Sequence, residues 1–211
     1  MASQISTPHT PKGRFAPTPS GPLHLGSLVT ALAGWLDMKA RQGQWWVRID
    51  DLDQTRAVPG AADIQLRQLE AFGLHWDGHV LYQNTHLDSY QAALEQLLHS
   101  GHAFYCNLSR KQLAAFGNRH PGMDYAVDPA PETAVRIKVP PQPISFHDRF
   151  MGLQQFDLHQ HEGAFVIRRR DGFFAYQLGS AVDDSALGFT DVMRGDDLLP
   201  SSAKQCWIID C

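Results

Sequence analysis

The chain has 211 residues, with 22 acidic and 18 basic side chains, so its formal net charge at neutral pH is −4. Hydrophobic residues make up 43% and charged residues 19% of it, which excludes a disordered chain and favours one large domain or one domain with an insertion. No apolar run reaches the roughly 18 residues of a membrane span, and the N-terminus lacks the apolar core of a secretory signal. With 3 cysteines there are too few for a disulfide scaffold, so we expect a cytoplasmic protein without a membrane partner. The mild acidity argues against a general nucleic-acid coat but leaves room for a local basic face.

The first half of the chain alternates between strand and helix patterns. Residues 1–12 are polar and interrupted by proline, which predicts a flexible tail. The predicted elements that follow are a strand at 13–16, a helix at about 26–42, a strand at 45–49, a helix from Pro59 to Gly73 and a helix at 87–99. The predicted buried faces of the first two helices are Leu28, Leu32, Trp35 and Leu36, and Ala62, Leu66, Leu69 and Phe72. Such alternation predicts βαβ units and a parallel sheet.

The second half has a different character. Residues 117–131 are rich in Gly, Pro, Asn and Asp, as in a loop. Residues 135–139 alternate between apolar and basic side chains, which predicts a half-exposed antiparallel strand, and a further strand is expected at 165–168. We therefore expect an α/β domain made of 13–104 and 165–211, with an inserted α+β subdomain at 105–164.

The most informative segment is the run of 14 residues from Arg14 to Ser27. It ends a predicted strand, turns through a rigid Pro/Gly loop and starts a helix on small residues. Such a junction directs backbone N–H groups and the positive end of the helix at an anion, and Gly26 lets a nucleotide lie close to the backbone. His24 adds a donor for a phosphate oxygen. The alternative is a proline-rich turn in which His24 only caps a core helix; the length of the segment favours nucleotide binding.

This segment resembles the signature region of the glutamyl-specific class I aminoacyl-tRNA synthetases. The resemblance continues through the stretches 47–53, 58–62, 73–78, 169–178 and 192–198. It implies an α/β fold, namely a Rossmann-like parallel-sheet nucleotide-binding catalytic domain with an inserted α+β subdomain. His24–Ser27 and Val58–Ala62 favour the short paralogues without an anticodon-binding domain, which use ATP and Mg²⁺ to attach L-glutamate to the queuosine of tRNA(Asp).

The resemblance also implies which residues bind the small substrates. Glutamate binding carries over onto Arg14, Phe15, Ala16, Pro17, Thr18, Asp50, Tyr176 and Arg194, and ATP binding onto Pro17, His24, Gly26 and Ser27, with His24 and Gly26 as catalytic positions. The chemistry of glutamate agrees with this assignment, because its two carboxylates require guanidinium groups and its ammonium group requires an anion. Asp50 stands where the family has glutamate, and one methylene fewer withdraws the carboxylate by about 1.5 Å. For Arg194 the alternative is a surface salt bridge with Asp196 or Asp197.

The predicted insertion departs from the family at its metal site. The family's zinc ligands correspond here to Cys106, Leu108, His120 and Asp124. Leucine cannot bind a metal, and a structural zinc requires four ligands that are usually rich in sulfur, so we expect no zinc on this remnant. The acidic and histidine residues at 159–162 invite a second metal interpretation, but a solvated polar turn explains them more simply.

The family's second signature, a Lys-x-Ser-Lys loop, is not reached before Cys211. We therefore expect a C-terminally incomplete catalytic domain. We also expect the chain to be a monomer. Two other interpretations stay open. In the first, the chain is a fragment of a glutamyl-tRNA synthetase that charges tRNA(Glu). In the second, it is a degenerate paralogue that binds glutamate or nucleotide without turnover.

Overall fold

The computed structural model describes residues 10–211, apart from the side chain of Arg110. Most of the tail predicted at 1–12, namely residues 1–9, lies outside this described part. The chain divides into two units: the residues up to Tyr82 together with Leu187–Gly195, and Gln83–Ala186 together with Asp196–Cys211. Within 10–211, no helix combines the length and apolarity that crossing a membrane requires.

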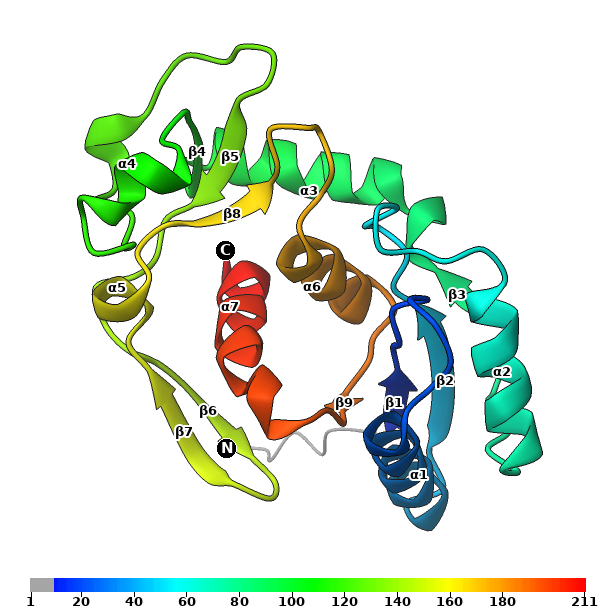
Figure 1. Cartoon of the computed structure of the whole chain (residues 1–211). Helices are drawn as coiled ribbons and strands as arrows, with labels where there is room; N and C mark the ends of the chain where they lie inside the picture. The colour runs from blue at the N-terminus through cyan, green and yellow to red at the C-terminus, as the bar shows by residue number, and fades with distance from the viewer. Residues whose placement is uncertain (1–9) are drawn as a thin grey trace. The chain divides into compact units, whose positions relative to one another are not determined.

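The first unit is built on a parallel sheet of four strands in the order β3-β2-β1-β9. Its elements are β1 (Lys12–Phe15), α1 (Leu25–Ala40), β2 (Gln44–Ile49), α2 (Ala61–Ala71), β3 (Leu81–Tyr82) and β9 (Asp191–Val192). β1 and β2 lie side by side, and α1 packs on both of them (Figure 1). The predicted parallel α/β architecture is therefore confirmed.

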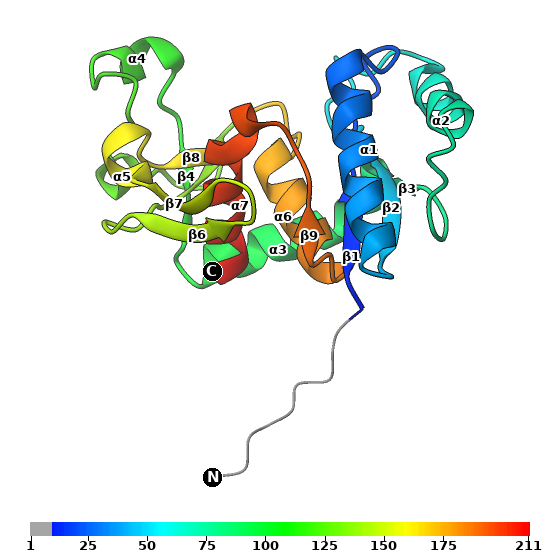
Figure 2. The same cartoon turned by 90° about the horizontal axis from the view of Figure 1, so that it is seen from below.

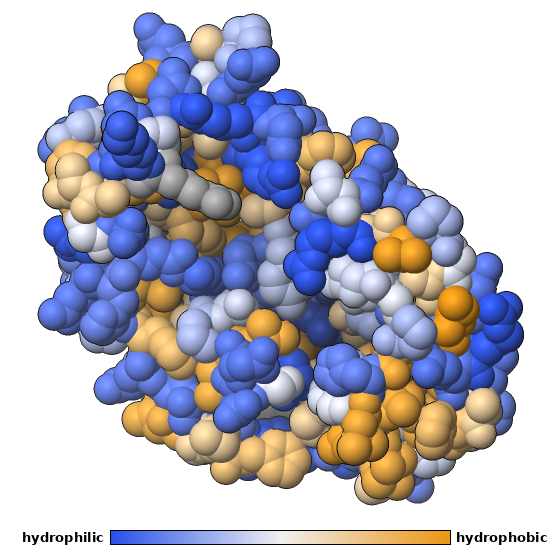
Figure 3. All heavy atoms as spheres, viewed as in Figure 1, coloured by the Kyte–Doolittle hydropathy of each residue, from blue (hydrophilic) through white to orange (hydrophobic). Residues whose placement is uncertain are grey.

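Small residues bring α1 close to the sheet. Its buried positions are Ala31, Gly34 and Met38, and a Cβ atom at Gly34 would lie only 3.2 Å from Nε1 of Trp45. The predicted buried face of this helix was partly wrong, because Leu32 and Leu36 are 45% and 51% exposed. Close helix–sheet contact leaves no space for a leucine at the contact line, so these side chains remain on the apolar surface over α1 (Figure 3).

The second unit contains an antiparallel sheet in the order β4-β5-β8, a hairpin of β6 and β7, and several helices. Its strands and helices are α3 (Leu87–His99), β4 (Ala103–Cys106), α4 (Arg110–Ala114), β5 (Ala134–Ile137), β6 (Ile144–Asp148), β7 (Gly152–Phe156), α5 (Leu158–His161), β8 (Phe165–Arg168), α6 (Tyr176–Ala186) and α7 (Leu199–Asp210). Short 3₁₀ turns lie at η1 (Gln83–Thr85), η2 (Met123–Tyr125) and η3 (Asp196–Leu198). α7 packs against α6 and the hairpin (Figure 2).

β5 is antiparallel to its neighbours, as the sequence predicted, but it is not half-exposed. It is the central strand between β4 and β8, and all four of its residues are buried. Arg136 can be buried there because its guanidinium donates to the carbonyl oxygen of Ala164 at 2.7 Å. Alternation of apolar and basic residues marked the strand correctly, but a basic side chain can face the interior when a partner lies there.

Candidate active site

Three of the predicted glutamate-binding residues lie at one edge of the parallel sheet. Arg14 belongs to β1, Asp50 directly follows β2, and Arg194 follows β9 by two residues. The carboxyl ends of adjacent parallel strands meet at this edge, which is where open α/β sheets bind their ligands. Arg14 and Asp50 are only 4% and 5% exposed. The fold therefore provides a sheltered edge with cationic and anionic side chains.

Asp50 is held by Arg48, a residue that the sequence analysis did not single out. Nε of Arg48 donates to Oδ1 of Asp50 at 2.6 Å, and Nη2 donates to Oδ2 at 3.2 Å. Neither side chain is more than 3% exposed. Residues two apart in extended backbone point to the same face, so the Arg-x-Asp spacing was the available signal. An ammonium group that binds at Asp50 must therefore share this carboxylate with a guanidinium.

Two glutamines of α2 fix the loop between β1 and α1. Gln65 donates through Nε2 to the carbonyl oxygens of Thr18 at 2.9 Å and Gly21 at 2.7 Å. Oε1 of Gln68 accepts from the backbone N–H of Leu23 at 2.7 Å. Sequence reasoning missed both, because a glutamine on a helix usually indicates the solvent face. Gln65 is only 2% exposed, so its hydrogen bonds hold the loop that carries the predicted nucleotide-binding residues.

His24 is the N-cap of α1. Nδ1 of its ring accepts from the backbone N–H of Ser27 at 3.2 Å, and Nε2 lies 3.0 Å from the Ser27 hydroxyl. A Cβ atom at Gly26 would approach the His24 ring to 3.1 Å, so glycine gives the ring space to fold over the helix end. The capping contact considered from the sequence is therefore present. The ring and the start of the helix are exposed, which leaves them accessible to a phosphate.

Tyr176 belongs to the second unit, where it begins α6 and is 37% exposed. The same helix carries Asp183, whose buried carboxylate accepts from Nε2 of Gln83 and from the hydroxyl of Tyr90, each at 2.9 Å. Nδ1 of His86 lies 2.8 Å from the other carboxylate oxygen. Three polar contacts on one buried carboxylate fix α6 against the start of α3 and so determine where Tyr176 lies within this unit.

The remnant of the family's zinc site does not fit zinc. Sγ of Cys106 lies 3.1 Å from Nε2 of His120, so these two potential ligands are together. Leu108 packs with its side chain against the apolar cluster that contains Phe104 and Cys106, and Asp124 is exposed. Among the described residues, no group of three His, Cys, Asp or Glu side chains is placed to bind a metal. Two donors cannot complete the four-coordinate site that a structural zinc requires.

The histidines at the second candidate metal position lie on a short exposed helix. His159 and His161 belong to α5 and are exposed, and the carboxylate of Glu162 pairs with Nζ of Lys204 at 2.6 Å. The exposure of the two histidines and the pairing of the carboxylate with a lysine both agree with the interpretation of residues 159–162 as a polar turn.

Lowering the pH should destabilise the protein through His120. Burial, with a contribution from the nearby Arg136, lowers the pKa of His120 from 6.5 to about 4. The unfolded chain therefore binds a proton on this ring between these pH values, and the folded chain does not. The contribution of His120 to the free energy of unfolding is fully present above pH 6.5 and is lost as the pH falls towards 4. At pH 5, about 2 kcal/mol of it is lost.

Urea unfolding at pH 8, 6.5 and 5 would measure this contribution. A His120→Gln variant, which has no titratable group at this position, should lose less stability over the same range. An identical pH dependence in the two proteins would contradict the assignment to His120.

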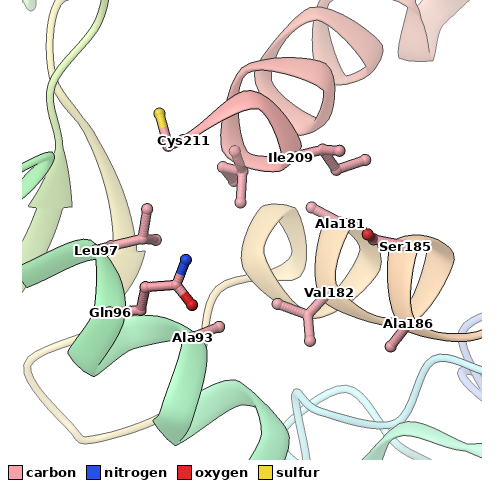
Figure 4. A pocket seen from close by; sticks show the side chains of 10 residues that line it. Ala93, Gln96, Leu97, Ala181, Val182, Ser185, Ala186, Ile209 and Cys211 are labelled. Atoms are coloured by element: carbon pink, nitrogen blue, oxygen red, sulfur yellow. The ribbon is translucent and has the colours of Figure 1, made fainter. Parts of the chain in front are cut away.

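A cavity of about 240 Å³ lies within the second unit, among α3, α6 and α7 (Figure 4). Small and apolar side chains such as Ala93 and Ala181 form most of its lining, and Gln96 and Ser185 are polar members. It contains none of the predicted substrate-binding residues and no charged side chain, so it does not match the chemistry of a dicarboxylic amino acid.

Comparison with known proteins shows the family to which the chain belongs. Residues 12–127 and 120–211 match the family described as tRNA synthetases class I (E and Q), catalytic domain. A glutamyl-Q tRNA(Asp) synthetase of Pseudomonas putida is 46% identical over 209 residues, which cover 99% of this chain and 70% of the relative. A protein of the same name from Xanthomonas campestris is 50% identical over 196 residues, covering 92% of this chain and 65% of the relative.

Solved structures agree with the sequence comparison. The glutamate tRNA ligase of Elizabethkingia meningosepticum, solved in complex with its amino acid, superposes with a TM-score of 0.84 at 26% identity. The match covers 95% of this chain and 47% of that one, so the chain spans about half of the solved ligase. The chain belongs to the class I tRNA synthetases of the E and Q group, a family of ligases, and it matches their catalytic domain.

Proposed function

We propose that the chain forms the catalytic part of an enzyme that activates L-glutamate with ATP and transfers the glutamyl group to the queuosine of tRNA(Asp). The observation that carries the proposal is the placement of Arg14, Asp50 and Arg194 at the carboxyl edge of the sheet, beside the loop that leads to α1. The relatives from Pseudomonas putida and Xanthomonas campestris are named glutamyl-Q tRNA(Asp) synthetases, and these names support the same substrate and the same RNA.

In the first step, an oxygen of the α-carboxylate of glutamate attacks the α-phosphorus of ATP. A carboxylate–phosphate anhydride forms, the bond to the bridging oxygen breaks, and pyrophosphate leaves with the electron pair. Phosphorus transfer of this kind depends mainly on positioning and charge stabilisation. ATP would enter as its magnesium complex, in which the cation would partly neutralise the charge of the phosphates.

The charge of each side chain would determine which group of the substrates it binds. Arg14 and Arg194 would bind carboxylate oxygens, and Asp50 would bind the ammonium group. Residues 15–18 would form the wall of the glutamate pocket. His24, Gly26 and Ser27 would present hydrogen-bond donors and the positive end of α1 to the phosphates of ATP. In the second step, a queuosine hydroxyl attacks the anhydride carbonyl and AMP leaves.

The test measures the two half-reactions separately. Glutamate-dependent exchange of pyrophosphate into ATP reports activation, and glutamylation of tRNA(Asp) with and without queuosine reports transfer. Transfer only to queuosine-containing tRNA(Asp) is the expected result. Transfer to tRNA(Glu) would favour the glutamyl-tRNA synthetase alternative, and binding of glutamate without exchange would favour the degenerate paralogue.

The glutamate pocket should discriminate against glutamine. An amide in place of the side-chain carboxylate loses a charge-assisted hydrogen bond to a guanidinium, which costs about 1.5–3 kcal/mol, or roughly a ten- to hundredfold weaker affinity. Calorimetric titration of the whole chain with the two amino acids measures the ratio. Equal affinities would overturn the assignment of Arg14 and Arg194.

A further inference from the structure

The loop between β1 and α1 has few hydrogen-bond donors of its own. Pro17, Pro19 and Pro22 have no backbone N–H and cannot donate. Within the loop, the backbone N–H of Ser20 donates to the carbonyl oxygen of Thr18 at 2.8 Å. The other carbonyl oxygens of the loop therefore depend largely on donors from other segments.

The segment that runs from the end of β2 to α2 supplies such donors. The backbone N–H of Asp50 donates to the carbonyl oxygen of Pro17 at 2.9 Å, and that of Val58 donates to the carbonyl oxygen of Pro19 at 2.8 Å. The side chain of Gln65 on α2 continues this series. The conformation of the loop thus depends on the connection that follows β2.

Gln65 bridges the bend of the loop with one buried amide. Its Nε2 donates to the carbonyl oxygens of Thr18 at 2.9 Å and Gly21 at 2.7 Å, and the residue is 2% exposed. Because carbonyl oxygens only accept, the group that faces them is the amino end of the amide. Thr18 and Gly21 flank Pro19 and Ser20, so one side chain holds both sides of the bend.

The oxygen of the same amide shows that the donors are the useful part of this side chain. Oε1 of Gln65 is buried and has no hydrogen-bond partner among residues 10–211. A buried acceptor without a partner lowers the stability of the fold, and a methionine at this position would bury no such group. Methionine would, however, leave the two loop carbonyls without these donors. A glutamate of the same size has no donor when it is ionised.

The loop leads directly into the residues proposed to bind the phosphates of ATP. Leu23 precedes His24, the N-cap of α1, and Gly26 and Ser27 lie in the first turn of that helix. A misplacement of about 1 Å at a reacting group can lower a rate on the order of a hundredfold, even when the mutation lies away from the chemistry. A side chain that only holds the loop can therefore affect the reaction.

We propose that Gln65 is a positioning residue for the activation of glutamate. Its two N–H groups hold the β1–α1 loop in the conformation that presents His24 and the N-terminus of α1 to the phosphates of ATP. The inference rests on the proposed function and adds a side chain that acts through the loop rather than on a substrate.

Pyrophosphate exchange by the whole chain tests the role of the two donors. Gln65→Met should lower kcat by about ten- to a hundredfold, while the KM for glutamate should change by less than about threefold. Gln65→Glu should lose at least as much, because its carboxylate faces two carbonyl oxygens. Parent-like kcat in both variants would overturn the proposal.

The matched control is the same substitution at Gln68, which lies on the same helix and contacts the same loop. Oε1 of Gln68 accepts from the backbone N–H of Leu23 at 2.7 Å, and a glutamate keeps this acceptor. Nε2 of Gln68 lies 3.5 Å from the carbonyl oxygen of Leu23, a weak contact whose loss matters little. Gln68→Glu should therefore lose much less rate than Gln65→Glu, and equal losses would contradict the role of the donors.

Leu69→Ala separates positioning from a loss of stability. Leu69 is fully buried in the core on the same helix, so its replacement destabilises the first unit without removing a donor from the loop. With both variants folded at the assay temperature, kcat should fall in Gln65→Met and stay near the parent value in Leu69→Ala. Equal losses of kcat would overturn the proposal. If Gln65→Met does not fold, the two glutamate variants decide the question.

Amide hydrogen exchange of the whole chain keeps this inference separate from the proposed function. Peptides that cover residues 18–28 should exchange at least about tenfold faster in Gln65→Met than in the parent, with β2 unchanged. A parent chain that does not exchange pyrophosphate would contradict the proposed function. Faster hydrogen exchange at 18–28 would still support the holding of the loop by Gln65, and unchanged exchange there would overturn it.

Discussion

Replacing Arg48 by methionine should lower the free energy of unfolding by about 3–5 kcal/mol, because removing one member of a buried ion pair leaves the other charge in poorly solvating surroundings. Both side chains are almost fully buried, and the guanidinium contacts both oxygens of Asp50, at 2.6 and 3.2 Å. Methionine has a long unbranched side chain that fills much of the same space, so the change removes mainly the charge. Urea unfolding monitored by tryptophan fluorescence measures it.

The second variant of this test removes both charges. Arg48→Met combined with Asp50→Asn should be more stable than Arg48→Met alone, because no charged group then remains buried in the pair. Arg48→Lys keeps a positive charge but loses the planar pair of donors, and should lie between the parent and Arg48→Met. If the double variant is less stable than Arg48→Met by the full cost of Asp50→Asn, the two residues do not act as a pair.

Periodicity in the sequence predicted the elements whose boundaries are marked by local chemistry. The helix expected at 87–99 and the strand expected at 165–168 have those bounds in the structure. The orientation of α1 was less predictable, because its leucines and its small residues each form a stripe at helical spacing. Close packing against the sheet selected the small residues, and that choice depends on the partner surface rather than on the helix itself.

In the candidate site too, some residues could be predicted from the sequence and others depended on contacts across the fold. Arg14, His24 and Asp50 could be named from a contiguous motif and a family resemblance, whereas their supporting residues could not. Arg48 looks like an ordinary basic residue at the end of a strand, and Gln65 like a solvent-facing position on a helix. Their roles arise from contacts formed across the fold, to Asp50 and to the carbonyl oxygens of the β1–α1 loop.

Replacing His24 by asparagine should lower the rate of glutamate-dependent pyrophosphate exchange by about a hundred- to a thousandfold, with little change in stability. Losing one preorganised donor to the developing phosphate charge typically costs about 2.7–4 kcal/mol in the transition state. Asparagine is among the most favourable N-cap residues, so it can replace the contact of the His24 ring with the backbone N–H of Ser27. The asparagine side chain is shorter and cannot present a ring N–H to a phosphate.

His24→Ala is the matched variant, because it removes the ring and the cap together. It should lose a similar factor in rate and, in addition, about 1 kcal/mol of stability from the uncapped helix. Glutamate affinity should be the same in both variants and in the parent, since the proposed contact of His24 is with phosphate and acts mainly in the transition state. If His24→Asn exchanges pyrophosphate as fast as the parent while His24→Ala does not, capping of α1 is the whole role of His24, and the phosphate contact must come from the helix end alone.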